Sequence, residues 1–344
     1  MKAAILDHIK EISIKEIAKP EIIAGEALIR VKYAGVCGSD IHAFLGELST
    51  AEIPLIPGHE FCGELVDFLP GIELDVPIDF KIGDLVTAHP TINCGVCESC
   101  LGGRDNLCPK LKIFGVNSPG AFAEYIKVPL RKVYRLSLDF EPKLGALVEP
   151  LAVAIHDIKR SNLSLGQTVL IIGAGPIGIL IGIVAKQCGA KEIVLTEISD
   201  YREKFANELG FIVVNPRKTD LEREIAKYNS GKGFDLVFEV SGSTSGISLI
   251  PKVAKNGGTV ILVGMPKDAL PMDIMKCEIK ELDVKGCRIH PQVDFATAVK
   301  LLNRGYFNDL ISKLVTRVFP LKNIKEAYNF ALESDEYMKI LIEI

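Results

Sequence analysis

The stretch QTVLIIGAGPIG, residues 167–178, carries the strongest indication of the fold. Its first half is a short apolar run, typical of a buried parallel strand, and its second half spaces three glycines as in a phosphate-binding turn that opens a helix. The first glycine allows a tight turn, the second lets the backbone approach a pyrophosphate, and the third packs the helix on the strand. The free N–H groups at the start of the helix favour an anion. The residues expected to hold a dinucleotide here are Gly173, Gly175, Pro176, Ile177 and Gly178.

Glycines at this spacing are weak evidence alone, so the flanking pattern matters. Further apolar strands are predicted at residues 193–197, 212–215, 235–240, 259–264 and 282–286, with helices between most of them. Six such strands predict an α/β fold with a doubly wound parallel sheet over residues 156–290. The alternative is a glycine turn in a doubly wound fold that binds nothing, which this complete context disfavours.

An acidic residue, Glu197, ends the second predicted strand. A carboxylate at this place accepts the ribose hydroxyls of a dinucleotide and would repel a 2′-phosphate, so NAD is favoured over NADP. Arg202, further along, could accommodate such a phosphate, although a solvated helix charge is the simpler explanation. The end of the 259–264 strand supplies the remaining cofactor candidates, which are Val263, Gly264 and Met265.

Residues 1–155 show a different pattern, with short apolar runs between turn residues and little helical periodicity. Strands are predicted at 3–6, 11–14, 27–32, 63–66, 84–87 and 121–128. Many short strands of this kind predict a small antiparallel β-barrel. The tail, residues 291–344, has helical stretches at 295–302 and 324–332 and a last strand at 339–344. We expect this strand to return to the N-terminal domain.

Four of the nine cysteines form one cluster with the spacing C-x2-C-x2-C-x7-C, within a lobe of about residues 88–115. They are Cys94, Cys97, Cys100 and Cys108. Four thiolates this close together in a chain can wrap a tetrahedral zinc ion, whereas the alternative is a loop that is merely rich in cysteine. With sulfur in every position no substrate could bind, so the predicted zinc is structural.

A second metal site is indicated by Cys37, in GVCGSDIH (residues 35–42), and His59, in PGHE (residues 57–60). Each residue alone is well explained as part of the core. Together they suit a zinc ion that takes a carboxylate as third ligand and leaves one position open for water or substrate. The carboxylates on offer are Glu60 and Glu149.

Composition limits the classes of function. A length of 344 residues suits about two domains, and a net charge of -4 gives no basic footprint for nucleic acid. The N-terminus lacks the apolar core of a signal peptide. The apolar run at 168–185 contains four glycines and a proline, so strand–turn–helix explains it better than a membrane span. We therefore expect a cytoplasmic protein.

These motifs together resemble the zinc-dependent medium-chain dehydrogenase superfamily over the whole chain. The resemblance implies a GroES-like barrel, a structural zinc lobe, a catalytic zinc and a Rossmann domain. The stretch EPLAVA, residues 149–154, stands where typical alcohol dehydrogenases use a third cysteine, and it is similar to the sorbitol, threonine and sugar-acid dehydrogenase branch. Residues 41–44 (IHAF) and 115–117 (GVN) resemble the bacterial enzymes that oxidise sugar acids such as galactonate.

The resemblance also implies roles for single residues. Ser39 and His42 match the proton relay of the family, and either Glu60 or Glu149 can approach the metal in this branch, with Glu149 ranked slightly ahead. Arg288 matches an arginine that meets polyol hydroxyls, with a surface salt bridge as the alternative. His290 is a weaker candidate of the same kind.

The sequence thus predicts a zinc- and NAD-dependent oxidoreductase that converts a secondary hydroxyl of a polyol or sugar acid to a ketone, as a homo-tetramer or homo-dimer. Rival hypotheses are an L-threonine 3-dehydrogenase, a general secondary-alcohol dehydrogenase and a non-catalytic dinucleotide sensor. A sensor would not need the zinc ligands or Ser39.

Overall fold

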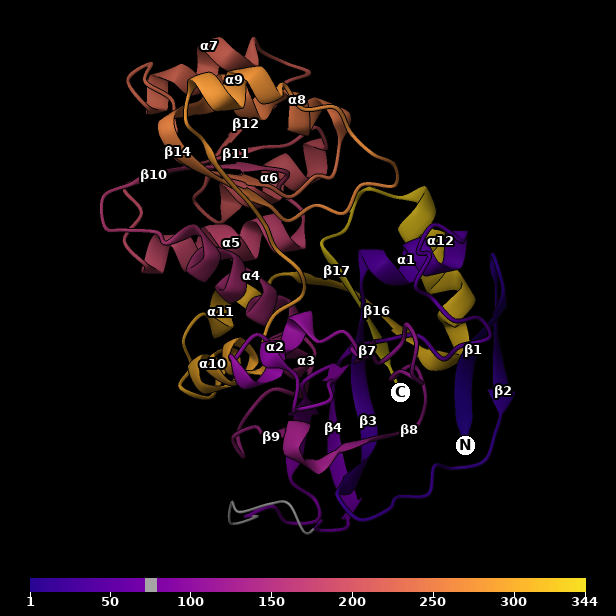
Figure 1. Cartoon of the computed structure of the whole chain (residues 1–344). Coiled ribbons are helices and arrows are strands. Elements are labelled where there is room, and N and C mark those ends of the chain that lie inside the picture. The colour runs from indigo at the N-terminus through magenta and orange to yellow at the C-terminus, as the bar shows by residue number, and fades with distance from the viewer. Residues whose placement is uncertain (72–78) are drawn as a thin grey trace. The chain divides into compact units, whose positions relative to one another are not determined.

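The computed structural model describes residues 1–71 and 79–344. The chain divides into two compact units (Figure 1). The first unit combines Met1–Ala152 with Pro291–Ile344, and the second is Val153–His290.

A seven-stranded sheet forms the centre of the first unit. In spatial order it contains β16 (Val315–Pro320), β17 (Lys339–Glu343), β3 (Glu26–Val36), β4 (Glu60–Phe68), β5 (Leu85–Ala88) and β9 (Val133–Arg135), while β8 (Tyr125–Pro129) also pairs with β3. The pairs are antiparallel except for β16 with β17. The predicted GroES-like antiparallel architecture is therefore confirmed. The parallel strand β16 was not predicted, because its sequence VTRVFP is half exposed and becomes a strand only through its pairing with β17.

Shorter elements complete this unit. The remaining strands are β1 (Lys2–His8), β2 (Glu11–Glu16), β6 (Thr91–Ile92) and β7 (Lys112–Ile113). The helices are α1 (Gly38–Leu45), α2 (Glu98–Leu101), α3 (Pro142–Gly145), α10 (Gln292–Asn303), α11 (Asn308–Ser312) and α12 (Ile324–Glu333), with 3-10 turns η1 (Asp105–Leu107), η2 (Leu130–Lys132) and η4 (Leu321–Asn323). Tyr328 of α12 packs against Phe44 and Phe122, with ring centroids 5.1 and 6.4 Å away. Helix α12 is thereby anchored in the core of the sheet.

The last strand returns to the beginning of the chain, because β17 pairs with β3 in the register Ile340 to Val36. The order β17–β3–β4 brings three chain segments to one end of the sheet. These segments carry Lys339, Cys37 and the pair His59–Glu60.

The second unit is a parallel sheet of six strands. Its spatial order is β12 (Ile212–Val214), β11 (Glu192–Thr196), β10 (Thr168–Ile172), β13 (Phe234–Glu239), β14 (Ala254–Leu262) and β15 (Asp283–Gly286). Its helices are α5 (Pro176–Gln187), α6 (Asp200–Glu208), α7 (Leu221–Ile225), α8 (Thr244–Val253) and α9 (Ile274–Ile279), with the 3-10 turn η3 (Ala226–Tyr228), and α4 (Val148–Ser161) crosses the boundary between the units. The predicted doubly wound sheet is confirmed.

The strand order reverses direction between β10 and β13. In open parallel sheets, ligands bind beyond the carboxyl ends of the strands at such a switch point. The apolar run at 168–185 forms β10 and most of α5. Within the described ranges of the chain, no helix is long and apolar enough to cross a membrane.

Candidate functional site

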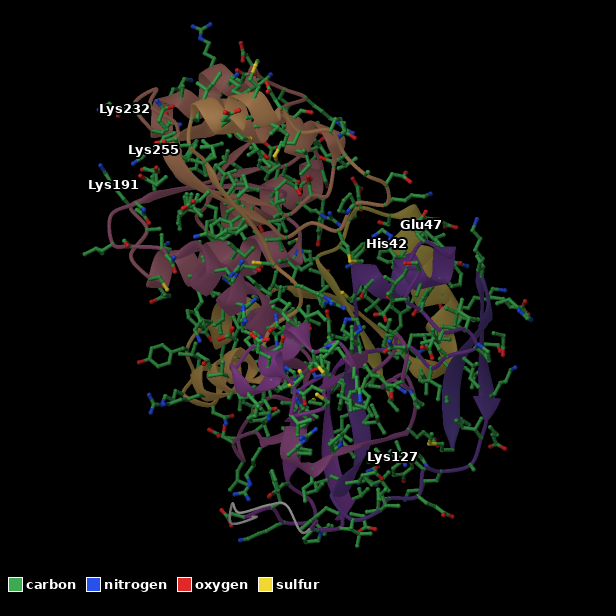
Figure 2. The ribbon with its side chains drawn as sticks, viewed as in Figure 1. His42, Glu47, Lys127, Lys191, Lys232 and Lys255 are labelled. Carbon is green, nitrogen blue, oxygen red and sulfur yellow. The ribbon has the colours of Figure 1, made fainter. Side chains whose placement is uncertain are left out.

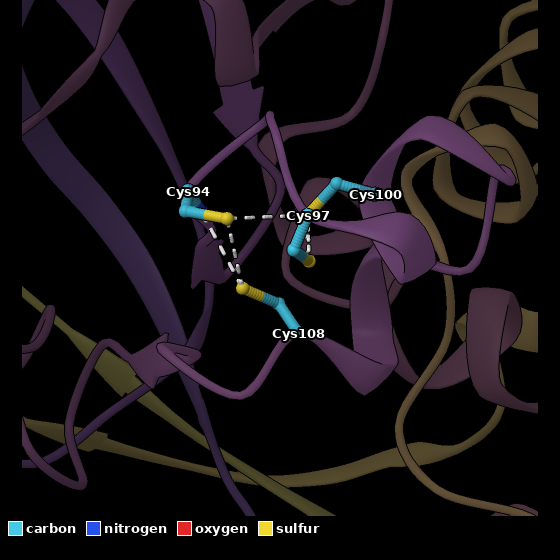
Figure 3. Close-up of side chains that lie close together, drawn as sticks. All are labelled: Cys94, Cys97, Cys100 and Cys108. Atoms are coloured by element: carbon cyan, nitrogen blue, oxygen red, sulfur yellow. Dashed lines mark hydrogen bonds between the residues drawn. The ribbon is translucent and has the colours of Figure 1, made fainter.

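The four clustered cysteines meet at one point (Figure 3). Their sulfur atoms lie 3.4 Å apart for Cys97 and Cys100, 3.6 Å for Cys94 and Cys108, and 3.9 Å for Cys94 and Cys100. A zinc ion with bonds of about 2.3 Å to four tetrahedral sulfurs would separate those sulfurs by about 3.8 Å. A disulfide would need about 2.05 Å. The donor set and its spacing therefore fit zinc.

The backbone of the cysteine loop already favours a thiolate. The N–H groups of Val96 and Cys97 lower the pKa of Cys94 to about 6, because they donate to its sulfur. Burial and the neighbouring thiols raise the pKa of Cys100 to about 12. Because a metal ligand must lose its proton, one ready thiolate provides a first point of attachment for the ion.

A second group of possible ligands is formed by Cys37, His59 and Glu60, whose ligand atoms lie within 4.8 Å of one another. Cys37 directly follows β3 and His59 directly precedes β4, and the antiparallel register pairs Gly35 with Glu60. Sheet pairing therefore brings together residues that are distant in sequence. A side chain at Gly35 could not be accommodated, since its Cβ would lie 2.0 Å from Glu60 Oε2.

Asp40 supports this group, a role that the sequence did not suggest. It accepts hydrogen bonds from the N–H of Cys37 at 2.8 Å and of Gly58 at 3.3 Å, and its Oδ1 lies 3.7 Å from His59 Nδ1. Burial raises the pKa of Asp40. Burial alone would lower the pKa of His59, but Asp40, Cys37 and Glu149 raise it well above its usual value. The carboxylate thus orients both ligand-bearing turns.

Lys339 forms a buried ion pair with Glu60, also unexpected from sequence. Its Nζ lies 2.6 Å from Oε1 and 2.5 Å from Oε2 and donates to the carbonyl of Val36 at 3.2 Å. Burial raises the pKa of Glu60, and Lys339 opposes this rise. Burial would lower the pKa of Lys339, but Glu60 raises it. We take the pair as ionised, because the ammonium group donates to Oε1 and lies beside Oε2 in a buried place.

Glu149 lies in the first turn of α4 and is buried. It does not belong to the group of ligand atoms within 4.8 Å, although its charge raises the pKa of both His59 and Glu60. The choice between Glu149 and Glu60 as the zinc ligand therefore remains a prediction.

The predicted relay residues lie on α1, directly after Cys37. Ser39 is half-buried, and His42 Nδ1 lies 3.0 Å from Oε2 of Glu47 (Figure 2). A carboxylate at Nδ1 favours the tautomer that leaves Nε2 as the acceptor. The sequence did not single out Glu47, because a glutamate on a half-exposed turn is unremarkable until its partner is known.

In the second unit the glycine turn has the conformation that its sequence requires. Gly173 has φ of +107°, and a Cβ at Gly178 would lie 2.0 Å from the carbonyl oxygen of Gly173. Glu197 accepts hydrogen bonds from the N–H groups of Ala174 at 2.9 Å, Ile198 at 2.8 Å and Ser199 at 2.9 Å. Its carboxylate thus ties the glycine turn to the end of β11.

The other predicted cofactor residues lie around the same sheet edge. A guanidinium nitrogen of Arg202 is 3.8 Å from the place that a Cβ on Gly175 would take. Val263 and Gly264 follow β14 directly, and Met265 is exposed. Of the predicted substrate residues, Arg288 is exposed and His290 is buried, and their contact with substrate stays a prediction.

Comparison with known proteins gives the family. Residues 23–137 match the model of the alcohol dehydrogenase GroES-like domain, and residues 176–304 match that of the zinc-binding dehydrogenases. The chain is 36% identical, over 93% of its length and 92% of the relative's, to 2-dehydro-3-deoxy-L-galactonate 5-dehydrogenase of Pseudoalteromonas atlantica. It is 32% identical to L-threonine 3-dehydrogenase of Shewanella sediminis, over 94% of each chain.

Solved structures of dehydrogenases have the same fold as this chain. A putative zinc-binding dehydrogenase from Sinorhizobium meliloti 1021, bound to NADP, superimposes with a TM-score of 0.91 at 30% identity and covers 100% of this chain and 99% of its own. A short chain alcohol dehydrogenase from E. coli CFT073, complexed with NADH, gives 0.90 at 26% identity, with the same coverage.

The chain belongs to the zinc-binding dehydrogenases with an alcohol dehydrogenase GroES-like domain. It is an oxidoreductase of the alcohol and polyol dehydrogenase type, as the sequence predicted.

Proposed function

We propose that this enzyme oxidises a secondary hydroxyl of a sugar acid or related polyol to a ketone, with zinc and NAD. The observation that carries the proposal is the mixed donor set of Cys37, His59 and a buried carboxylate. Compared with a set that includes a second thiolate, a carboxylate leaves the metal a harder Lewis acid, suited to oxygen-rich substrates. The sugar-acid dehydrogenase at 36% identity supports the substrate class.

The donor sets support two zinc ions per chain. The four sulfurs would hold a structural ion, and Cys37 and His59 would hold a catalytic one with a carboxylate. A bound catalytic zinc supplies Lewis acidity that lowers the pKa of a coordinated hydroxyl. We propose Glu149 as the resting carboxylate ligand, because both oxygens of Glu60 face Lys339. Glu60 lies with Cys37 and His59 and is the alternative ligand.

Ser39 and His42 have the chemistry for moving the substrate proton away. The hydroxyl of Ser39 can accept that proton and pass another on, and the imidazole of His42 can release one to solvent because it is partly exposed. Glu47 would hold the ring in place during this exchange. His42→Gln should therefore slow turnover, because a glutamine amide cannot take up and release the proton.

The preference for NAD over NADP rests on Glu197. A carboxylate has about four lone-pair sites, and three backbone N–H groups occupy Glu197, which leaves one for a ribose hydroxyl. Its charge opposes a 2′-phosphate, while Arg202 near Gly175 would attract one. The neighbouring structures hold both NADP and NADH, so selectivity must be measured on this chain. Glu197→Ser should relax the preference, and adding Arg202→Ala should remove the gain with NADP.

We also infer a cytoplasmic homo-oligomer, a tetramer or a dimer. All nine cysteines are free thiols, as suits a reducing compartment. In the described part of the chain β15 pairs only with β14, so one edge of this strand is available to a second copy.

The decisive test is a screen of five- and six-carbon polyols, aldonates, threonine and simple alcohols with NAD and with NADP, followed at the nicotinamide absorbance. We expect kcat/KM for an aldonate or polyol to exceed that for ethanol, butanol or benzyl alcohol, because buried polar groups reject substrates that leave them unpaired. Arg288→Ala should weaken aldonates more than neutral polyols, since only aldonates offer a carboxylate to the guanidinium. Simple alcohols as the best substrates would refute the proposal.

Threonine oxidation is the second candidate, because the chain is 32% identical to an L-threonine 3-dehydrogenase in an alignment that covers 94% of this chain. A clear preference for threonine in the same screen would decide for it.

A further inference from the structure

A buried carboxylate at the end of β13 has no place in the function described so far. Glu239 is only 1% exposed, although glutamate is rarely buried without compensation. It is the last residue of the strand that borders the switch point of the parallel sheet.

The compensation comes from the loop that follows. Oε1 of Glu239 accepts from the N–H groups of Ser241 and Gly242, each at 3.1 Å, and from the hydroxyl of Ser241. Oε2 accepts from the N–H of Gly242, also at 3.1 Å. Successive N–H groups that converge on one anion form a nest that stabilises charge without a cationic partner.

The backbone of the same residue holds a second loop. The carbonyl of Glu239 accepts from the N–H of Val263 at 2.9 Å and of Gly264 at 2.8 Å. A Cβ at Gly264 would lie 2.3 Å from the nitrogen of Gly242 and 2.7 Å from Glu239 Oε2. The loops after β13 and after β14 are therefore packed around this one carboxylate.

The two loops lie on one side of the glycine turn. A Cβ on Gly173 would be 3.3 Å from the nitrogen of Ser241, so the loop after β13 lies against the phosphate-binding turn. The adenosine half of a dinucleotide belongs to β10 and β11, which carry that turn and Glu197. Such sheets bind a dinucleotide as two mononucleotide halves, so the ends of β13 and β14 face the other half. Ser241 and Met265 are exposed there, above the buried Glu239.

We propose that Glu239 is a positioning residue that shapes the nicotinamide half of the cofactor site. Its carboxylate holds Ser241 and Gly242 against the ends of β13 and β14, so that their outer surface is formed before the cofactor binds. This inference rests on the proposed nicotinamide cofactor and adds a residue to that site. We expect the adenosine half to depend less on Glu239, because the glycine turn is tied to Glu197 by the N–H of Ala174.

Charge matters as well as shape. Glu239→Gln keeps the size of the side chain, but the new amide NH2 must face the backbone N–H of either Ser241 or Gly242. Two hydrogen-bond donors would then face each other. The loop after β13 would then turn one of these peptide groups away from residue 239, and the surface formed by Ser241 and Gly242 would become mobile. Pre-organisation for one half of the ligand would be lost while the other half stays intact.

The test compares two ligands on the same full-length protein, by titration calorimetry with NAD and with ADP, which lacks both the ribose and the ring of the nicotinamide half. Glu239→Gln should weaken NAD binding about tenfold or more and leave ADP binding within about twofold, since a lost hydrogen bond to a charged group has an effect of this size. The KM for NAD should rise while the KM for the alcohol stays unchanged. Glu208→Gln, an exposed position on α6 of the same unit, is the matched control.

The ratio of the two affinities separates positioning from mere stability, because an unfolded fraction lowers the number of sites for both ligands equally. Ser241→Ala removes only the hydroxyl donor and should change the ratio of the two affinities in the same direction by a smaller factor. This variant replaces Glu239→Gln in the test if Glu239→Gln does not fold. Equal loss of NAD and ADP affinity, or no loss of either, would overturn the inference. A wild-type protein that binds neither NAD nor NADP would overturn the proposed function and this inference with it.

Discussion

The two predicted metal sites of the first unit are assembled in different ways. The four-cysteine lobe takes all its ligands from one loop, residues 94–108, and needs no other segment. The site at Cys37 and His59 takes its ligands from the ends of two paired strands and surrounds them with the buried charges of Asp40, Glu60 and Lys339. The first arrangement offers four sulfur ligands, enough for a complete tetrahedral shell, whereas the second offers fewer ligands and, as we propose, keeps a position open for substrate. We propose that the first site serves stability and the second serves catalysis, and the first three predictions below test this difference.

The largest effect should come from Cys37→Ser. We expect activity to fall roughly a thousandfold or more, because the metal that polarises the hydroxyl is lost, while NAD affinity stays within about twofold. Calorimetry with NAD and steady-state kinetics measure both. Cys97→Ser is the matched change in the lobe and should act mainly on thermal stability. If Cys37→Ser abolished NAD binding as well, the assignment of the two functions to separate units would be wrong.

Chelation should distinguish the two sites without mutation. A mild chelator should abolish activity and leave about one zinc equivalent bound to folded protein, because a shell of four thiolates holds zinc more tightly than one with oxygen and an open position. Elemental analysis and circular dichroism before and after treatment provide the measurement. A single zinc in fresh, fully active protein would contradict the comparison.

The ion pair at the second site should be sensitive to the loss of one partner. Lys339→Met should lower the free energy of unfolding by about 3–5 kcal/mol, since it leaves Glu60 charged and buried. Urea unfolding of the zinc-loaded protein measures this. Lys15→Met removes an exposed pair with Asp7 and should change stability far less, because water already solvates both charges. Equal small effects would mean that the buried charges are not structurally coupled.

The smallest effect concerns a buried acid away from both metal sites. Both oxygens of Asp157 on α4 lack a hydrogen-bond donor within residues 1–71 and 79–344, apart from the weak thiol donor of Cys287, and burial raises the pKa of Asp157 to about 7. Its folded pKa exceeds its unfolded value, so its contribution to stability is present at low pH and lost as pH rises through about 7.

Asp157→Asn cannot titrate. We expect the free energy of unfolding of this variant, relative to that of the wild type, to increase by about 1–3 kcal/mol when the pH is raised from 5 to 8. Urea unfolding at the two pH values checks this prediction, with Asp139→Asn, at an exposed position, as the control. A pH-independent difference would mean that Asp157 is ionised throughout.

Much of the fold was predictable because its signals are local. The apolar runs and the glycine spacing of residues 167–178 led to the doubly wound sheet, and the short strands led to the barrel-like unit. Strand β16 and helix α4 were not predicted. Strand β16 is half exposed and lacks a regular alternation, and helix α4 carries Pro150, a residue typical of breaks, in its first turn. Their structure depends on neighbours that the sequence does not identify.

The family, the class of reaction and the candidate ligands were predictable from sequence, because each motif is defined by the spacing of cysteines or glycines within one short segment. Strand pairing and loop packing, in contrast, determine which charged groups lie beside the metal ligands and within the cofactor loops. Asp40, Lys339 and Glu239 belong to common residue types, and the sequence does not indicate which groups they contact. They gain their roles when strand pairing and loop packing bury them beside a partner, because a charge removed from water must be compensated by the groups that the fold brings to it.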